Sequence, residues 1–375
     1  MPDLLILTAT TGGGHVSLAE ALRDLLAAHA RVEIVDPLPR LVQLHYRLVS
    51  RHARGLWAAE YALTNRPLSA LAVHQLCAML LARSLGALLR RHRYDMVITT
   101  FPFLSYEAAQ AIKRLPWPMP FAMLLTDPDR LHATWLTERG AAATFAPTYE
   151  TYVQARAAGF APDRLHLTGW PVRRQFYAAD SGARTATLAR LELDPRRLTL
   201  FAQGGGEGSA GFARSVEIAL TAAPDGIQIM LAVGTNHRLI ERFSSMAQVR
   251  TIPYTRDIAP FMAAADAVMG KAGPNMLFEA TTLGKPFIAT TYIPGQEEPN
   301  LAFIQAHGLG WAALGARALR ALIAALAADP GKLRAMEETV NRYRAWNAAA
   351  TATIAARIRA IMGAGNRANT AGGDG

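Results

Sequence analysis

Two glycine clusters each follow an apolar run and precede a helix-prone segment: TTGGGH at 10–15 and QGGGEGSAG at 203–211. Glycine in such a turn lets the backbone approach a phosphate, and the N-terminus of the next helix supplies free N–H donors and roughly half a positive charge. Both clusters are therefore candidate phosphate-binding loops. For the second cluster, the alternative is a tight turn without a ligand.

His15 stands where the first predicted helix begins. A helix N-terminus disfavours imidazolium, so a histidine there stays neutral and can accept a proton near pH 7. His15 is therefore a candidate general base. The alternative is a histidine that only caps or packs against the start of the helix.

The first cluster also permits a dinucleotide-binding site. Gly12 and Gly14 have the G-x-G spacing, and Asp36 ends the next apolar run, where an acid that binds ribose is expected. Ser17 stands in place of the third glycine, which counts against a dehydrogenase.

Polar residues gather at two further helix starts in the second half of the chain. In the string GKAGPNMLFEATT, Glu279 lies on the helix that follows a strand. It can accept both hydroxyls of a ribose whose phosphates sit on the preceding loop, or it can only complement the helix dipole. The string IPGQEEPN gathers Gln296, Glu297 and Asn300. Amide and carboxylate groups together suit several sugar hydroxyls, although alone they would indicate an acidic helix cap.

Several other chemistries are excluded. No HExxH, CxxC, GxSxG or Walker A pattern and no set of kinase motifs occurs in the sequence. Asp127, Asp129 and His132 could bind a metal, but this cluster is weakly specific. Cys77 is the single cysteine, so the chain forms no intrachain disulfide and no cysteine-based metal site, which favours a reducing compartment.

Short apolar runs alternate with helical segments along the chain, which is typical of parallel α/β sheets. The runs are 4–9, 32–36, 96–100 and 121–126 in the first half, then 198–203, 227–233, 249–253, 267–270 and 286–291 in the second. The sequence therefore predicts an α/β fold with two Rossmann-like domains joined near 170–195.

We expect an N-terminal domain at 1–172, a C-terminal domain at 173–340, and a C-terminal helix with a disordered tail at 341–375. The helix is expected to end near Met362, because glycine and polar residues dominate the sequence beyond it. With 375 residues, 51% of them hydrophobic and 18% charged, the chain can bury two cores. Disordered, collagen-like and small disulfide-rich proteins are excluded.

The net charge is +10, from 39 Lys and Arg against 29 Asp and Glu, which indicates an anionic partner. Residues 40–93 alone hold nine arginines and one acid, and apolar and aromatic residues alternate with these arginines at helical spacing. Such helices can lie on anionic lipid, or they can be the solvated faces of ordinary packing helices. The candidate membrane contacts are Arg47, Arg51, Arg54, Trp57, Arg90 and Arg91.

Neither a secretory signal nor a transmembrane helix is predicted. The N-terminus MPDLLILTAT lacks a basic start and a cleavage site and is expected to form a buried strand. The most apolar stretch, 68–89, is interrupted by His74, Gln75 and Arg83, and charge at bilayer depth is costly. We therefore expect a protein that is not exported.

The strings TGGGH, GGGEG, KAGP followed by EA, and PGQE with Asn300 stand in one order and at compatible spacing. This ordered set resembles the GT-B glycosyltransferases that include monogalactosyldiacylglycerol synthases, processive diacylglycerol glucosyltransferases and the N-acetylglucosamine transferase of peptidoglycan synthesis. TDPDRLHATW at 126–135 looks like the TD…HPTW segment of the diacylglycerol branch, and GWPVRRQF at 169–176 looks like its GxPVRxxF linker. The similarity spans most of the chain.

The resemblance implies the GT-B fold, in which two Rossmann-like domains face each other across a cleft. It implies an inverting transfer of a hexose from a UDP-sugar to the hydroxyl of a membrane lipid, diacylglycerol in first place. No cofactor and no essential metal are expected, because loop amides, a helix N-terminus and Arg173 would meet the charge on the leaving diphosphate. The expected partners are the UDP-hexose, the lipid and an anionic membrane surface, without nucleic acid. The expected location is the cytoplasmic face of the cell membrane, as a peripheral protein.

Single residues follow from the resemblance. His15 matches the family's catalytic histidine, and Asp127 is the alternative base. The predicted acceptor-binding residues are Gly12, Gly13, Gly14, His132 and Trp135. The predicted donor-binding residues are Gly205, Gly206, Arg173, Thr255, Gly273, Pro274, Asn275, Glu279, Gln296, Glu297 and Asn300.

The chain departs from the family pattern at two places. Asn275 and Met276 stand where the family usually has Gly-Thr, so a hydroxyl expected near the phosphates is missing, and Pro128 stands where relatives often carry leucine. Two other functions therefore stay open. One is an N-acetylglucosamine transferase that acts on a polyprenyl-linked peptidoglycan precursor, and the other is a catalytically impaired relative that binds a nucleotide or lipid. Glucose and galactose both stay open as the hexose.

Overall fold

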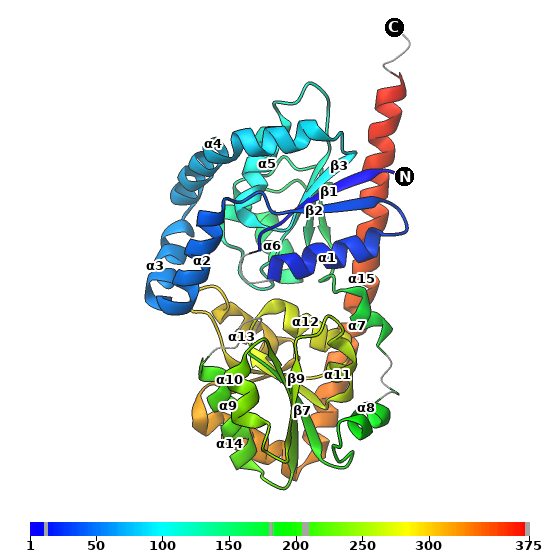
Figure 1. Ribbon diagram of the computed structural model, residues 1–375. Helices are drawn as coiled ribbons and strands as arrows, with labels where there is room; N and C mark the ends of the chain where they lie inside the picture. Colours follow the sequence, from blue (N-terminus) through cyan, green and yellow to red (C-terminus); the bar gives the residue numbers. More distant parts are fainter. Residues whose placement is uncertain (11–13, 180–181, 183, 205–209, 372–375) are drawn as a thin grey trace. The chain divides into compact units, whose positions relative to one another are not determined.

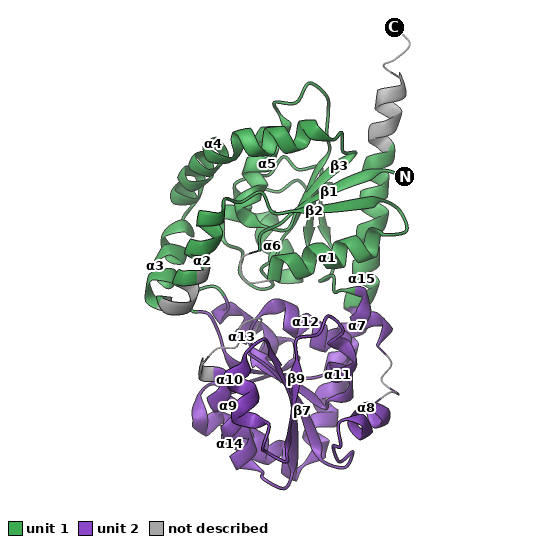
Figure 2. Cartoon of the chain, in the orientation of Figure 1, with its two compact units in different colours: residues 1–173, 294–296, 347–375 green, residues 174–293, 297–346 purple. Residues whose placement is uncertain are grey.

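A computed structural model describes residues 1–10, 14–179, 182, 184–204 and 210–371. The chain forms two compact units (Figure 2). Unit 1 contains residues 1–173, 294–296 and 347–375, and unit 2 contains 174–293 and 297–346. The segment predicted as a separate C-terminal region is therefore divided between the two units.

Unit 1 is built on a six-stranded parallel sheet with the order β2-β1-β3-β4-β5-β6 (Figure 1). Its strands are β1 (Asp3–Leu7), β2 (Arg31–Val35), β3 (Met96–Thr99), β4 (Phe121–Leu124), β5 (Ala143–Ala146) and β6 (Leu165–Leu167). The first four were predicted. The other two escape sequence analysis because β6 has only three residues and β5 reads Ala-Thr-Phe-Ala, which is less apolar than β3 or β4 of the same length.

Unit 2 repeats this plan with the order β12-β11-β10-β7-β8-β9, again parallel. Its strands are β7 (Leu198–Gln203), β8 (Ile227–Gly234), β9 (Val249–Pro253), β10 (Ala267–Lys271), β11 (Phe287–Thr291) and β12 (Gly310–Ala312). Five were predicted, and the three-residue β12 was missed.

Each sheet has one point where the strand order reverses. In unit 1, β2 and β3 lie on opposite sides of β1, and in unit 2, β8 and β10 lie on opposite sides of β7. The loops that leave the carboxyl ends of the strands diverge at such a point, so ligands of open α/β sheets bind there.

Helices connect the strands of each unit. Unit 1 has α1 (Gly14–Leu26), α2 (Arg40–His52), α3 (Arg54–Thr64), α4 (Pro67–Arg91), η1 (Pro102–Leu104), α5 (Ser105–Ile112), η2 (Ala133–Leu136) and α6 (Tyr149–Ala157). Unit 2 has α7 (Arg174–Ala178), α8 (Arg184–Arg190), α9 (Ala210–Ala222), α10 (His237–Phe243), α11 (Ala259–Ala264), α12 (Pro274–Thr282), α13 (Glu298–Ala306) and α14 (Gly315–Ala328). The predicted helical character of the arginine-rich segment is confirmed by α2, α3 and α4.

Helix α15 (Pro330–Ala371) begins in unit 2 and ends in unit 1. It continues past Met362, so the prediction of a frayed tail is wrong for 363–371. Extending an existing helix costs far less than starting one, which explains why unfavourable residues still join it. The final residues 372–375 lie outside the described ranges.

Asn347 on α15 anchors this helix to unit 1. Its side-chain oxygen accepts the backbone N–H of Trp170 at 2.7 Å, and its amide nitrogen donates to the Trp170 carbonyl at 2.9 Å. All of these groups are buried. The adjacent Gly169 has φ +66°, and a Cβ there would lie 2.8 Å from the Asn347 carbonyl oxygen, so the close approach requires glycine.

We expect Asn347→Ala to lower the free energy of unfolding by about 2–4 kcal/mol, because two buried backbone groups lose their partners. Urea denaturation monitored by tryptophan fluorescence measures this change. Thr353→Ala, at an exposed position of the same helix, is the control and should change stability by less than about 0.5 kcal/mol. Equal stabilities of the two variants would contradict the anchoring role.

Candidate functional site

His15 lies at the reversal point of the unit 1 sheet. It belongs to the first turn of α1, which follows β1, and its Nδ1 lies 2.8 Å from the carbonyl oxygen of Thr100, the residue after β3. A carbonyl only accepts, so Nδ1 carries the proton and donates it. Nε2 is consequently the basic nitrogen of the neutral ring.

Desolvation lowers the pKa of His15 to about 4, although the bond to Thr100 opposes this shift. The ring is therefore neutral at pH 7, as predicted, but the main cause is burial rather than the helix N-terminus. The edge of the ring packs against Phe101, with centroids 4.9 Å apart. Gly14 opens α1, whereas Gly12 and Gly13 lie outside the described residues.

Asp127, the alternative base, is the neighbour in sequence of a residue that contacts His15. It follows Thr126, whose hydroxyl oxygen is 3.5 Å from His15 Nδ1. Burial raises the pKa of Asp127 to about 6, opposed by the backbone N–H of His132, which donates to Oδ2 at 3.1 Å. The structure thus brings both candidate bases to one edge of the sheet.

His132, predicted to bind the acceptor, joins its own loop to α3. Its Nδ1 lies 2.7 Å from the Thr134 hydroxyl and accepts the Thr134 backbone N–H at 3.4 Å. Nε2 therefore carries the proton and faces the carbonyl of Tyr61 at 3.3 Å. Desolvation lowers the pKa of His132 to about 4. Both ring nitrogens contact protein groups, so the side chain positions the loop.

Trp135, predicted to bind the lipid acceptor, is fully buried. Its side chain is 0% exposed and belongs to the hydrophobic core of unit 1. The side chain therefore exposes no surface in this structure, and its role toward the acceptor stays a prediction.

Asp36, the acid that made a dinucleotide site conceivable, is already engaged. Its Oδ2 accepts the backbone N–H and the hydroxyl of Thr10 at 2.7 and 2.6 Å, and its Oδ1 accepts the N–H of Leu38 at 2.9 Å. The carboxylate thus connects the end of β2 to Thr10. Because its oxygens are already bonded within the protein, it does not support the ribose-binding role that a dehydrogenase would require.

In unit 2, the predicted phosphate and ribose segment lies at the reversal point between β7 and β10. Gly273 is the N-cap of α12, Pro274 is its first residue and Asn275 its second. Proline suits this position because its missing N–H would be unpaired anyway. Glu279 is buried in the second turn of the same helix. The N-terminus of α12 therefore points its backbone donors out of the carboxyl edge of the sheet.

Two residues predicted to recognise the sugar also hold this loop in place. Glu297 is buried, forms an ion pair with Lys271 and accepts the backbone N–H of Ile293 at 2.8 Å. Asn300 donates from its side chain to the carbonyl of Ala272 at 2.8 Å. The sequence offered no sign of the Lys271 partner, which is 26 residues from Glu297.

The other residues predicted to bind the donor make few contacts that bear on this role. Gln296 has a buried Oε1 without a hydrogen-bond partner among the described residues. Thr255 follows β9, and its hydroxyl accepts the backbone N–H of Asp257 at 3.1 Å. Arg173 in unit 1 approaches Glu20 to 3.9 Å. Gly205 and Gly206 lie outside the described residues.

Helices α2, α3 and α4 follow one another along one side of unit 1 (Figure 1). They carry eleven of the eighteen exposed large hydrophobic residues in the described ranges. We call this set the apolar face; it comprises Leu41, Val42, Leu44, Leu48, Leu56, Leu63, Leu68, Leu71, Leu76, Met79 and Leu80. The sequence analysis noted that apolar residues alternate with the arginines here, but it did not predict which of them are exposed, since periodicity does not tell which face of a helix meets the protein.

The predicted membrane arginines fall on the same helices. Arg47 lies in α2, and Arg51 and Arg54 lie at the end of α2 and the start of α3. Trp57 is half-buried, with its ring edge-on to Tyr46 at 5.0 Å. Arg90 and Arg91 close α4 and are exposed, and Arg91 pairs with Glu33 at 3.0 Å.

Helix α4 is long and apolar enough to cross a membrane, the one such helix in the described ranges, and 22% of its most apolar window is buried. Its other side carries buried residues, among them Leu81, Leu85 and Leu89, and packs against α5 and η2. The helix thus has one side in the core and one side free.

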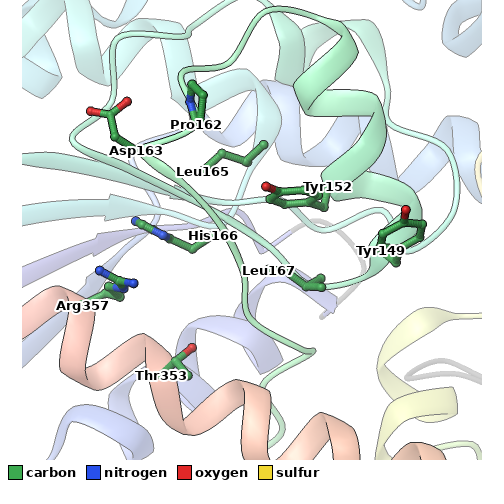
Figure 3. Close-up of a pocket in the computed structure, with 9 residues that line it drawn as sticks. All are labelled: Tyr149, Tyr152, Pro162, Asp163, Leu165, His166, Leu167, Thr353 and Arg357. Atoms are coloured by element: carbon green, nitrogen blue, oxygen red, sulfur yellow. The ribbon is translucent and has the colours of Figure 1, made fainter.

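A cavity of about 700 Å³ lies elsewhere in unit 1, at the outer edge of the sheet (Figure 3). Arg357 from α15 and His166 from β6 lie at one end, and Tyr149 and Tyr152 from α6 lie at the other. None of its lining residues was predicted to function. The structure has no group of three or more metal-ligating side chains in the part of the chain that it describes.

Solved structures share this architecture. The calicheamicin glycosyltransferase CalG4 aligns with a TM-score of 0.63 at 14% identity, over 97% of this chain and 98% of CalG4. A Staphylococcus aureus MnaA–UDP complex aligns with a TM-score of 0.58 at 12% identity, over 92% of each chain. At such identities the similarity establishes the fold. The predicted GT-B fold is confirmed.

Family models cover both units. The model of monogalactosyldiacylglycerol (MGDG) synthase matches residues 15–172, and that of the glycosyltransferase family 28 C-terminal domain matches residues 199–349. The chain thus has the GT-B fold, resembles the MGDG synthases in its first unit and resembles the C-terminal domain of glycosyltransferase family 28 in its second.

Individual relatives agree with the two models. The chain is 28% identical to a probable MGDG synthase 2 (chloroplastic) of Oryza sativa subsp. indica and 28% identical to MGDG synthase 3 (chloroplastic) of Arabidopsis thaliana. Each alignment covers 82% of this chain and 70% of the relative. The MGDG synthase (chloroplastic) of Spinacia oleracea is 27% identical over 82% of this chain and 62% of its own. The family resemblance inferred from the motifs is confirmed.

The two site histidines should differ in tautomer. We expect ¹⁵N NMR of the imidazole nitrogens to report His15 as the Nδ1–H form and His132 as the Nε2–H form from pH 5.5 to 8, because each folded pKa is about 4. A free histidine titrates near 6.5. His15→Gln and His132→Gln assign the signals. Protonation of either ring above pH 6 would contradict the geometry.

Proposed function

We propose that the protein transfers a hexose from a UDP-hexose to the hydroxyl of diacylglycerol, with inversion, as a peripheral enzyme on the cytoplasmic face of the cell membrane. One observation carries the proposal. The bond from His15 Nδ1 to the Thr100 carbonyl leaves Nε2 basic at the carboxyl edge of the sheet, in the unit that matches MGDG synthase. A neutral, oriented imidazole is what a general base for a lipid hydroxyl needs.

In the proposed reaction, Nε2 of His15 takes the proton of the acceptor hydroxyl as its oxygen attacks the anomeric carbon of the sugar. The bond from that carbon to the diphosphate oxygen breaks, and UDP leaves with the electron pair. The backbone donors at the start of α12, together with Gly205, Gly206 and Arg173, would meet the diphosphate charge. We propose that no metal is required, so EDTA should leave the rate unchanged.

Two features of the second half of the chain support a nucleotide-sugar donor. The buried Oε1 of Gln296 lacks a partner among the described residues, and a sugar hydroxyl would satisfy it. Glu279 lies on the helix whose N-terminus would receive the phosphates. Solved proteins of the same fold include Anabaena HepE in complex with UDP-glucose. The acceptor class comes from the MGDG synthase relatives.

The apolar face supports membrane attachment. Leu68, Met79 and Leu80 on α4 are 84%, 70% and 68% exposed, and burying such side chains contributes about 1.5–3 kcal/mol each. Arg90 lies on the same helix and would add electrostatic attraction to anionic lipid. A peripheral arrangement fits best, because the other side of α4 packs on the protein.

We expect wild-type protein to form a glycolipid from diacylglycerol and UDP-glucose or UDP-galactose in anionic micelles. His15→Ala should lower kcat at least about 100-fold, since a general base contributes roughly 10²–10⁴. The pKa of about 4 means that His15 stays in the base form down to pH 5, so activity should persist there. A loss centred near pH 6 that disappears in Asp127→Asn would instead assign the base to Asp127, whose pKa is about 6.

Other outcomes of this assay have distinct meanings. Transfer from UDP-N-acetylglucosamine to a polyprenyl-linked acceptor would replace the proposed lipid with a peptidoglycan precursor. UDP binding without any transfer would indicate a binding protein.

Met79→Glu/Leu80→Glu should weaken binding to vesicles containing phosphatidylglycerol at least about tenfold, because two exposed apolar side chains are lost from the apolar face. Vesicle sedimentation at several salt concentrations measures the binding, and salt should weaken it further. Leu314→Glu, an exposed leucine of unit 2, is the matched control. Undiminished binding of the double variant would remove α4 from the membrane contact.

A further inference from the structure

A buried histidine–glutamate pair lies beneath the apolar face. His74 on α4 is 0% exposed and Glu107 on α5 is 1% exposed. His74 Nδ1 lies 2.9 Å from Glu107 Oε1, and its Nε2 lies 3.0 Å from the carbonyl oxygen of Thr134 in η2. One imidazole thus connects α4 to α5 and to the loop that carries His132.

Proton bookkeeping constrains this pair. Because the Thr134 carbonyl only accepts, Nε2 of His74 carries a proton. One further proton lies between Nδ1 and Glu107 Oε1, so the pair is neutral whichever atom holds it. The other oxygen, Glu107 Oε2, is buried without a partner among the described residues. An unpaired buried oxygen costs less on a neutral carboxyl, which favours a protonated Glu107 that donates to Nδ1.

A row of aromatic rings connects this pair to the candidate base. Phe103 lies 5.9 Å from the His74 ring and 6.3 Å from the His132 ring. Phe101 lies 5.8 Å from Phe103 and 4.9 Å from the His15 ring. Displacement of the loop around His132 would therefore reach the rings that pack against His15.

We propose that His74 and Glu107 are positioning residues that hold the 132–135 segment in register with α4, so that the acceptor lipid is presented to the base from the membrane-facing helix. This inference rests on the proposed function, because it assigns the segment to the acceptor side of the transfer. Neither residue touches the reacting atoms; both act through Thr134 and His132.

The choice of polar residues supports this role. An apolar pair of similar volume would pack α4 on α5 about as well as a buried ionisable pair. It would, however, leave the carbonyl of Thr134 without a donor in a buried place, at a cost that the observed imidazole avoids. The pair therefore serves the position of η2, beyond the contact between two helices.

Two conservative substitutions of His74 separate its two bonds. In His74→Gln the amide nitrogen can take the place of Nε2 and donate to Thr134, whereas in His74→Asn the amide lies near the place of Nδ1 and reaches only Glu107. Glu107→Gln mimics the protonated acid and keeps the hydrogen bond to His74 Nδ1, whereas Glu107→Leu removes that bond. Gln75→Asn, at the exposed neighbouring position, is the control for substitution on α4.

The first readout is hydrogen exchange of the peptide covering 127–137, compared with peptides from β7 and β8. The second is the KM for diacylglycerol against the KM for the UDP-hexose. We expect His74→Asn to speed exchange in that peptide and to raise the acceptor KM, each roughly tenfold, as the loss of the buried hydrogen bond to Thr134 predicts. Glu107→Leu keeps that bond but no longer orients the imidazole, so its effects should have the same direction and be smaller. The donor KM should stay at the wild-type value, and His74→Gln and Glu107→Gln should resemble wild type in both readouts.

Any one of four results would overturn the proposal. Unchanged exchange in His74→Asn would show that the pair does not hold the segment, and this readout needs no activity. Faster exchange with an unchanged acceptor KM would show that the 132–135 segment does not contribute to acceptor binding. A parallel rise in both KM values, or equal behaviour of His74→Gln and His74→Asn, would indicate a general loss of structure. Absence of transfer by the wild type overturns the proposed function itself, whatever the exchange shows.

Discussion

Both units depend on one constraint of parallel sheets, the reversal of strand order beside the first strand. At that point the loops that leave the carboxyl ends of the strands diverge, and the crevice between them is where ligands of such sheets bind. In unit 1 the imidazole of His15 bonds to the carbonyl of Thr100 there. In unit 2 the same position holds the start of α12, secured by Asn300 and by the pair of Lys271 with Glu297. The chemistry proposed for the chain follows from these two strand ends.

A common feature of the site is that polar side chains bind backbone carbonyls. His15 holds Thr100, His74 holds Thr134, and Asn300 holds Ala272. Such bonds fix loops that have no sheet of their own, and a buried carbonyl without a donor is costly. They also determine which ring nitrogen carries the proton in each histidine. Loop position and protonation state are thus determined by the same contacts.

The sequence predicted most of the framework. Apolar runs identified nine strands, whereas β6 and β12 contain only three residues and β5 reads Ala-Thr-Phe-Ala, which does not stand out as an apolar run. The positions of His15, Gly273 and Glu279 followed from the motifs. Their partners did not, because Thr100 is 85 residues from His15 and Glu107 is 33 residues from His74. Burial was the other quantity that residue type alone did not reveal: it placed Trp135 inside and the leucines of α4 outside.

The division of α15 has a consequence for synthesis on the ribosome. Trp170 emerges with the first unit, but its backbone partner Asn347 is made only after unit 2 has been translated. At typical elongation rates this delay is about 10–35 s. During that time the backbone N–H and carbonyl of Trp170 lack the partner that they have in the finished protein. The contact between α15 and Trp170 can therefore form only after the whole of unit 2 has been synthesised.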